Sequence, residues 1–303
     1  MSPSAVLLMA YGTPAALDDV AAYYTHIRRG RPPTPAEVAH LVERYRAIGG
    51  TSPLLAITRE VAAALSARLG LPVYVGMKHW HPFIADVVAQ MHQDGIARAA
   101  AVVLAPHYSR LSVGAYLEAA QEAAARCGGP ALAAVEAWHL HPGLVAVLAD
   151  RVRTTLGRLP AEAHLLFTAH SLPKRILEWG DPYPAQLVAS ARAVAAAAGA
   201  ARWSFAFQSA SATGEPWLGP DVLDALRDLQ ATGTRDVVVC PIGFVADHLE
   251  VLYDLDVEAA GLAAALGMRL VRTPSLNASP AFVEVLADVA ATALGAPQIA
   301  SRQ

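Results

Sequence analysis

The sequence of 303 residues contains only two cysteines, Cys127 and Cys240, which stand far apart and without a Cys-x-x-Cys spacing. Their scarcity excludes a disulfide framework, a zinc site built from thiolates and an iron–sulfur cluster held by four cysteines. No run of about 18 uninterrupted apolar residues is present, and the first residues lack the basic and apolar regions of a signal peptide. We therefore expect a protein of the reducing cytoplasm that does not insert into membranes.

A large excess of charge and a phosphate-binding loop are absent as well. The formal net charge is only −3, which argues against a long nucleic-acid footprint. The segment Gly49-Gly50-Thr51-Ser52 is too short for a P-loop and lacks its lysine, and no GxGxxG motif follows the first apolar run. A plain nucleotide-binding α/β protein is therefore the least favoured reading.

Apolar residues make up 54% of the chain, which is enough to bury a large core. Short apolar runs rich in β-branched residues alternate with longer segments of helical periodicity, and this alternation predicts parallel sheets covered by helices on both faces. The helix-breaking sequence Gly128-Gly129-Pro130 interrupts the alternation, which then begins again. We predict an α/β protein of two similar lobes, residues 1–127 and 128–303, with the last helix able to pack back on the first lobe.

The predicted strands are 5–10, 73–77, 99–105, 131–138, 163–169, 203–208, 237–239 and 269–272. The predicted helices are 17–28, 36–48, 58–69, 83–94, 113–127, 143–156, 183–198, 221–230, one that begins near 245, and 280–294.

Chemically capable residues follow several of these strands. Tyr11 follows the first strand, and His170 ends the apolar run 165–169. Because ligands of an open parallel sheet bind outside the carboxyl ends of its strands, Tyr11, His170 and Glu250 are candidates for one cleft between the lobes. Beside a carboxylate, His170 could accept a proton or bind a metal. The alternatives are a histidine that caps the sheet and a tyrosine that is merely packed.

Five other histidines divide into three groups. His79, which follows the second strand, is kept as a candidate for the cleft. His81 and His107 are interpreted as structural. His139 and His141 are expected on the surface rather than in a metal site.

An acidic pattern follows the strand at 237–239. Asp247, Glu250, Asp254 and Glu258 recur at i, i+3, i+7 and i+11 of the predicted helix, where like charges repel by about 0.2–0.5 kcal/mol per neighbouring pair. No Lys or Arg lies between residues 235 and 269 to neutralise them locally. The pattern is either a solvated acidic face or a row of carboxylates that meets a cation at the mouth of a cleft.

A basic cluster lies in the first lobe, beside three tyrosines and with few acidic neighbours. Arginine is suited to bidentate capture of carboxylates or phosphates, so the cluster predicts an anionic ligand, although a solvated basic face is the alternative. Its members are Arg28, Arg29, Arg31, Arg44 and Arg46.

Together these motifs resemble the ferrochelatases, and most closely the soluble bacterial coproporphyrin ferrochelatases, over about residues 6–294. The segments that carry the resemblance are LLMAYGTP (7–14), YYTHIRRGRP (23–32), RYRAIGGTSPL (44–54), KHWHPFI (78–84), VVLAPHYS (102–109), AHSLP (169–173), GDPYP (180–184), WLGPDV (217–222) and GFVADHLEVLYDLD (243–256).

The resemblance implies a fold of two lobes, each with a parallel four-stranded sheet, and the insertion of Fe²⁺ into a porphyrin held between them. It assigns His170 and Glu250 to iron binding and proton acceptance on one face of the macrocycle. Tyr11 matches the residue on the opposite face of the macrocycle, where it could serve as an axial ligand. Metallation removes two pyrrole protons and strips water from Fe²⁺, and an imidazole with a carboxylate can assist both steps.

Further assignments rest on the same resemblance. Asp254 and Glu258 match outer acidic positions that pass or hold a hydrated cation. The positions that match porphyrin-carboxylate contacts are Arg28, Arg44, Tyr45, Ser52 and Tyr116, to which His79 is added as a cleft candidate. Four propionates on coproporphyrin would need such cationic and hydroxyl donors.

Two departures from the family pattern bear on these assignments. The segment at 207–216 reads Phe207-Gln208-Ser209-Ala210-Ser211 at its start, differs from the usual motif and is given no role. The hydrophobic lip and the cysteine cluster of membrane-associated members are absent. We therefore expect no iron–sulfur cluster and no other cofactor, with Fe²⁺ and porphyrin as substrates.

The sequence favours a monomeric enzyme that makes iron coproporphyrin III for haem synthesis. We expect a transient contact with the enzyme that uses its product. Three alternatives stay open. They are the same reaction on protoporphyrin IX, a cobalt or nickel chelatase acting on a sirohydrochlorin-type ring, and a haem-binding or haem-delivery protein on the same scaffold.

Overall fold

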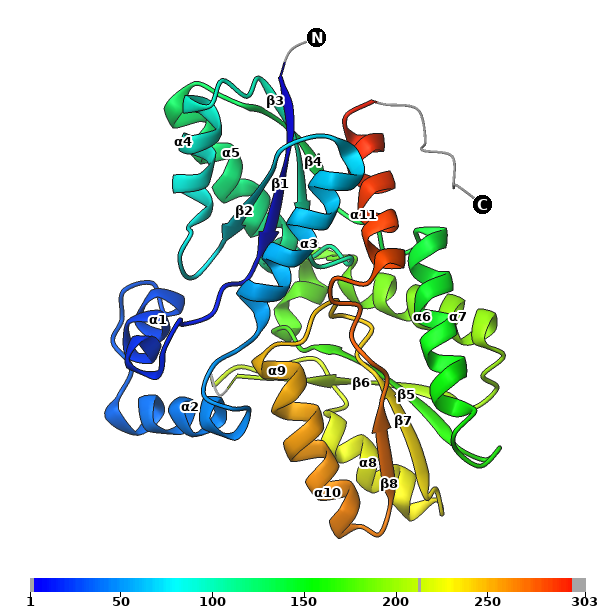
Figure 1. The fold of residues 1–303 in the computed structure, drawn as a ribbon. Coiled ribbons are helices and arrows are strands. Elements are labelled where there is room, and N and C mark those ends of the chain that lie inside the picture. Colours follow the sequence, from blue (N-terminus) through cyan, green and yellow to red (C-terminus); the bar gives the residue numbers. More distant parts are fainter. Residues whose placement is uncertain (1–2, 212–213, 296–303) are drawn as a thin grey trace. The chain divides into compact units, whose positions relative to one another are not determined.

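The structure, a computed structural model, describes residues 3–211 and 214–295 and divides into two compact units (Figure 1). The first contains the residues up to Trp138 together with those from Leu276 onward, and the second is the continuous segment His139–Ser275. The division falls after Trp138 rather than after Cys127, because the strand that follows Cys127 pairs with the first sheet.

The first unit is built on a parallel sheet in the order β2-β1-β3-β4. Alternate residues of β1 point to opposite faces, as the period of a strand requires. Ala5, Leu7 and Met9 face the core cluster formed with α4 and α5, and α3 and α11 pack together on the other side (Figure 1). The strands are β1 (Ser4–Ala10), β2 (Val73–Met77), β3 (Arg98–Val103) and β4 (Ala131–Val135).

The helices of the first unit are α1 (Val20–Ile27), α2 (Pro35–Ala47), α3 (Leu54–Leu69), α4 (Ile84–Gln93), α5 (Ala115–Cys127) and α11 (Pro280–Ala293). The 3₁₀ turn η1 (Leu17–Asp19) precedes α1, and the π-helical turn η2 (Arg110–Gly114) precedes α5. The last helix, α11, contacts α3, β3 and β4, so it covers the first sheet although the whole second unit precedes it in the chain.

The second unit repeats the same topology. Its parallel sheet has the order β6-β5-β7-β8, which is the order of the first sheet with each strand number raised by four. Leu166, Val237 and Val239 face the core cluster with α8 and α10, while α6 and α7 pack on each other against the opposite face. The strands are β5 (His164–His170), β6 (Trp203–Gln208), β7 (Asp236–Cys240) and β8 (Arg269–Arg272).

The helices of the second unit are α6 (Pro142–Leu156), the 3₁₀ turn η3 (Lys174–Trp179), α7 (Tyr183–Ala198), α8 (Val222–Ala231), α9 (Leu249–Leu252), the π-helical segment η4 (Asp254–Ala259) and α10 (Ala260–Ala265). The prediction of two parallel four-stranded sheets flanked by helices is confirmed. Across the described ranges, no helix is both long enough and apolar enough to cross a membrane.

One predicted helix was wrong in form. The helix expected from about 245 begins only at Leu249, because His248 has an extended backbone with φ −160° and ψ −179°. After four α-helical residues the chain widens into the π-helical segment η4. The acidic residues therefore do not share a stripe of one regular α-helix.

Candidate active site

The chemically capable residues of the second unit gather at the carboxyl end of its sheet. Strands β5 and β7 are neighbours although β6 lies between them in sequence, so the strand order reverses between β5 and β7. Such a switch point is where open parallel sheets bind ligands. His170 is the last residue of β5, and the chain that leaves β7 carries Glu250.

Glu250 lies between two imidazoles. Its Oε1 is 3.5 Å from Nε2 of His170, and its Oε2 is 3.6 Å from Nε2 of His248. In each histidine, Nδ1 faces a backbone carbonyl: that of Ser171 for His170, and that of Ala246, at 2.9 Å, for His248. A carbonyl can only accept, so both Nδ1 atoms carry protons, and both Nε2 atoms are turned towards the carboxylate.

This arrangement determines the charge on the pair. A neutral Nε2 and a carboxylate would face each other with lone pairs only, so a proton between them is favourable. Burial alone would lower the pKa of His170, but the carboxylate of Glu250 outweighs it and raises that pKa. Burial would likewise raise the pKa of Glu250, but His170 and His248 hold it well below its usual value. The resting pair is an imidazolium and a carboxylate.

Close packing brings the two strand ends together. A Cβ added to Gly243 would lie 2.5 Å from Cβ of Ala169, the residue before His170, and 2.9 Å from its Cα. The amide of Gly243 donates to the carbonyl of Thr168 at 3.2 Å. Only glycine lets the chain that leads to Glu250 pass this close to the end of β5.

The backbone of His170 is fixed from the other side by Tyr183. This tyrosine is 6% exposed, and its hydroxyl donates to the carbonyl of His170 at 3.0 Å. Burial, with the charge of Glu250, raises the pKa of the Tyr183 phenol, which therefore stays protonated as a donor.

The predicted row of four carboxylates is not one row. Asp247 is 3.2 Å from Nη1 of Arg272 and accepts from Oγ of Ser275 at 2.6 Å. Arg272 stands on β8, outside the window that the sequence argument searched for neutralising cations. Asp254 is only 4% exposed and accepts from the hydroxyl of Ser209, whereas Glu258 is exposed. Asp247 is thus a member of an ion pair.

In the first unit, Tyr11 and His79 come together as a result of the parallel pairing of β1 and β2. The amide of His79 donates to the carbonyl of Tyr11 at 2.8 Å, and the two rings lie 4.5 Å apart. Nδ1 of His79 is 3.2 Å from Nδ1 of His26 on α1. Burial and the positive charge of Lys78 lower the pKa of His79 to about 3, so its imidazole is neutral.

Lys78 is a half-buried cation of this group. Burial, with Arg29 nearby, lowers its pKa to about 8, and its Nζ lies 4.7 Å above the ring of Tyr116. Tyr116 itself is 5% exposed, so the ring predicted to touch a porphyrin carboxylate is mostly covered. Tyr11, by contrast, is 39% exposed.

The predicted carboxylate contacts lie in and around α1 and α2. Arg28 donates to Oε1 of Glu37 at 2.6 Å, while Oε2 of Glu37 accepts from the amide of Thr34, the residue that caps α2. Tyr45 is 2% exposed and shares a hydrogen bond of 3.2 Å with Thr13. Tyr45 therefore supports the turn after Tyr11.

Arg44 and Ser52 are half-buried in this region, and Oγ of Ser52 accepts from the amide of Leu54 at 3.3 Å. Of the histidines set aside, His107 is buried, as a structural residue would be, and His141 accepts from the amide of Gly143 at the start of α6.

Sequence reasoning missed two residues of these groups. His248 lies two positions before Glu250, a spacing that puts the two on different sides of a regular helix, but the extended backbone at His248 brings its ring back to the carboxylate. Lys78 directly precedes His79 in the sequence, but only its partial burial, which the sequence does not reveal, distinguishes it from a surface lysine.

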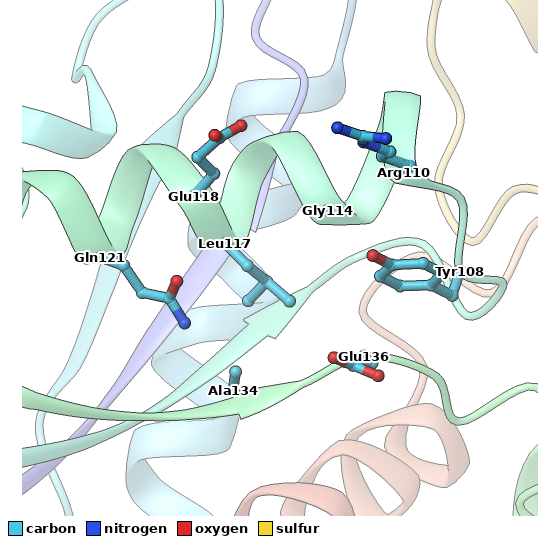
Figure 2. A pocket seen from close by; sticks show the side chains of 8 residues that line it. All are labelled: Tyr108, Arg110, Gly114, Leu117, Glu118, Gln121, Ala134 and Glu136. Atoms are coloured by element: carbon cyan, nitrogen blue, oxygen red, sulfur yellow. The ribbon is translucent and has the colours of Figure 1, made fainter. Parts of the chain in front are cut away.

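A separate polar pocket of about 310 Å³ lies between α5 and the edge strand β4 (Figure 2). Tyr108 and Arg110 close one end of it, and Glu118, Gln121 and Glu136 project from the helix and from the chain after β4. None of the predicted site residues lines it.

The family model described as Ferrochelatase matches residues 3–294 of the chain. The chain is 46% identical to a ferrochelatase of Herpetosiphon aurantiacus over 94% of its own length and 97% of the relative's. It is 47% identical to the coproporphyrin III ferrochelatase of Anoxybacillus flavithermus, with 94% of each chain covered.

Among solved structures, SirB of Bacillus subtilis with Fe³⁺ is similar in fold, with a TM-score of 0.60 and coverage of 97% of this chain and 98% of that one. The sequence identity is 11%, so this likeness shows the shared chelatase-type fold alone. The match of the family model and the identity to two full-length relatives together show that the chain belongs to the ferrochelatase family, the enzymes that insert a metal into a porphyrin.

Proposed function

We propose that the chain inserts Fe²⁺ into coproporphyrin III, with His170 and Glu250 as the pair that receives iron and protons. The observation that carries this assignment is the carboxylate of Glu250 held between two Nε2 atoms whose Nδ1–H groups are tied to backbone carbonyls. Once deprotonated, His170 presents a lone pair at Nε2 beside a carboxylate, which is a donor set suited to Fe²⁺.

The resting charge of the pair supports a coupled exchange of a proton for iron. Because the pKa of His170 is raised, its Nε2 is protonated before iron arrives. A divalent cation at Glu250 repels the imidazolium, lowers the pKa of His170 and favours loss of that proton, which frees Nε2. After the metal moves on, the same imidazole and carboxylate can accept the two protons that leave the pyrrole nitrogens.

The site is suited to passing an ion on rather than keeping it. Within 3–211 and 214–295, no set of three or more His, Cys, Asp or Glu side chains is arranged to hold a metal ion. A structural zinc site, in contrast, is closed by four ligands. We treat iron as a substrate of this site, and propose that no resident cofactor is required.

Two observations support coproporphyrin as the porphyrin. A relative that is 47% identical is named a coproporphyrin III ferrochelatase. The chain carries a group of arginines on and between α1 and α2, among which Arg28 and Arg44 are only partly exposed. Four carboxylates on one ligand need cationic partners of this kind, and arginine binds them in two-point contacts. We assign carboxylate binding to Arg28, Arg44 and Ser52.

Anaerobic Fe²⁺ insertion followed by absorbance, with coproporphyrin III and protoporphyrin IX measured in parallel, tests the proposal. Rapid metallation of coproporphyrin and slow metallation of protoporphyrin is the expected result. Preference for protoporphyrin would keep the reaction but refute the substrate. Tight binding of finished iron porphyrin without turnover of either ring would indicate a haem carrier instead.

A further inference from the structure

The end of strand β6 contacts the segment 247–258, which carries the four carboxylates of the predicted row and is called the acidic segment below, at two points. Gln208, the last residue of β6, pairs in register with His170, the last residue of β5. Ser209 follows directly. These two residues belong to the segment 207–216, to which the sequence assigned no role, and the side chain of each reaches across to the chain that carries Glu250 and Asp254.

Gln208 holds the backbone of Glu250. Its side chain is completely buried, and its Nε2 donates to the carbonyl of Glu250 at 2.7 Å. Its Oε1 is also buried, and no described residue donates to it. A buried amide with one end unpaired is costly, so an apolar side chain would be expected here if packing were its only purpose.

Ser209 holds the carboxylate of Asp254. Its hydroxyl donates to Oδ2 of Asp254, which is 4% exposed. The backbone of Ser209 has a φ of +62°, a left-handed conformation that few residues other than glycine adopt without strain. Glycine would suit this backbone better, but glycine has no hydroxyl. The serine is therefore explained by its bond to Asp254.

The segment that receives these bonds has an irregular helical ladder. Helix α9 is only four residues long, and the amide of Glu258 donates to the carbonyl of Tyr253 in the i to i+5 pattern of a π-helix. The helical run 249–265 is thus interrupted by a π-helical segment, where its ladder of hydrogen bonds is irregular. Contacts from the rigid sheet can supply the missing constraint.

We propose that Gln208 and Ser209 are positioning residues that tie the acidic segment to the sheet: Gln208 fixes Glu250 opposite His170, and Ser209 fixes the carboxylate of Asp254. This inference rests on the proposed function, because it assigns the two residues to the delivery of Fe²⁺ to the His170–Glu250 pair. The two bonds are assigned to different steps: Ser209 acts through Asp254, which we place on the path of the incoming iron, and Gln208 acts through Glu250 of the reacting pair.

Two substitutions separate this role from a stabilising one. Ser209→Gly removes the hydroxyl and relieves the left-handed strain, which offsets part of the cost of the lost hydrogen bond to the buried Asp254, so the variant should fold. Gln208→Met keeps the shape, removes the donor and also removes the unpaired buried Oε1, so it should fold. Ser204→Ala is the matched control, because Ser204 lies on β6 like Gln208, and the substitution deletes a side-chain hydrogen bond of 2.8 Å to His164 on β5, away from Glu250.

Kinetics and hydrogen exchange read out the result. Ser209→Gly should raise KM for Fe²⁺ about tenfold and leave KM for porphyrin within about twofold, and Gln208→Met should lower kcat about tenfold, whereas Ser204→Ala should change neither. The backbone amides of residues 249–258 should exchange faster in both variants, and their exchange rates should be unchanged in the control.

The outcomes distinguish the two proposals. Native kinetics and native exchange in folded Ser209→Gly and Gln208→Met would overturn the positioning role while leaving the ferrochelatase assignment intact. If the native protein metallated neither porphyrin, the proposed function would fail, and unchanged exchange at 249–258 would then refute the tie independently.

Discussion

Replacing Gly243 with alanine should damage catalysis more than it damages the fold. The added Cβ would stand 2.5 Å from Cβ of Ala169 and 2.9 Å from its Cα. Carbon atoms pack at about 3.5–4.0 Å, so the chain after β7 must retreat from the end of β5 by roughly 1 Å. Ala169 is backbone-fixed inside the sheet and cannot give way as a flexible side chain could.

The size of both effects follows from that displacement. Overpacking of this kind costs about 1–3 kcal/mol of the free energy of unfolding. The moved chain leads to Glu250, whose Oε1 faces Nε2 of His170 at 3.5 Å. A misplacement of about 1 Å between reacting groups can cost about 100-fold in rate. We therefore expect Gly243→Ala to fold with reduced stability and to lose about 100-fold in kcat for Fe²⁺ insertion.

Urea unfolding and anaerobic metallation should be measured on the same preparations. Gly261→Ala is the control for the substitution itself, because Gly261 lies in α10 and the added Cβ would have no atom within 4 Å apart from its own helix backbone and chain neighbours. It should gain up to about 1 kcal/mol of stability and keep its activity. Ala169→Gly should restore part of the activity of Gly243→Ala. A Gly243→Ala enzyme with native kcat would refute the reasoning.

Three other substitutions test the site directly. His170→Ala should bind porphyrin but lose at least about 100-fold in metallation rate, and native turnover in that variant would remove His170 from the mechanism. Because Glu250 raises the pKa of His170, kcat/KM for Fe²⁺ should rise with pH as His170 loses its proton, through a pKa above about 6.5. Glu250→Gln should lose most of the activity, and the rise in its residual activity should move to lower pH. A rise at the same pH as in the native enzyme would contradict the pairing of His170 with Glu250. Arg28→Ala should weaken coproporphyrin binding about tenfold in a fluorescence titration, whereas Arg46→Ala, which breaks an exposed ion pair with Glu43, should not; equal affinities would exclude Arg28 as a contact.

Periodicity was sufficient to predict the sheets because the central strands lie in the interior of each parallel sheet. Almost every residue of β1 and β7 is buried, so these strands appear in the sequence as nearly continuous apolar runs. The boundary between the units was misplaced because glycine and proline mark a turn, but do not say to which sheet the next strand belongs. The pairing of β4 with β3 is a long-range choice that no local signal carries.

The site was predictable where chemistry sits at a strand end, and not where it depends on backbone shape. His170 and Glu250 face each other as expected, but the sequence spacing of Asp247 suggested a free carboxylate. Arg272 pairs with Asp247 at 3.2 Å from a neighbouring strand, beyond any helical neighbourhood. His248 was overlooked because helical spacing was assumed through a residue whose backbone is extended.

The position of α11 has a consequence for the order in which the chain can fold. The second unit is one continuous segment, His139–Ser275, and all of its strands are synthesised before α11. The strands of the first sheet emerge earlier, but β3 and β4 are covered only once α11 has been synthesised. Eight residues of α11 are buried. During synthesis on the ribosome, the second unit can therefore be complete while the first unit still exposes an apolar face. A chaperone would be needed during this interval.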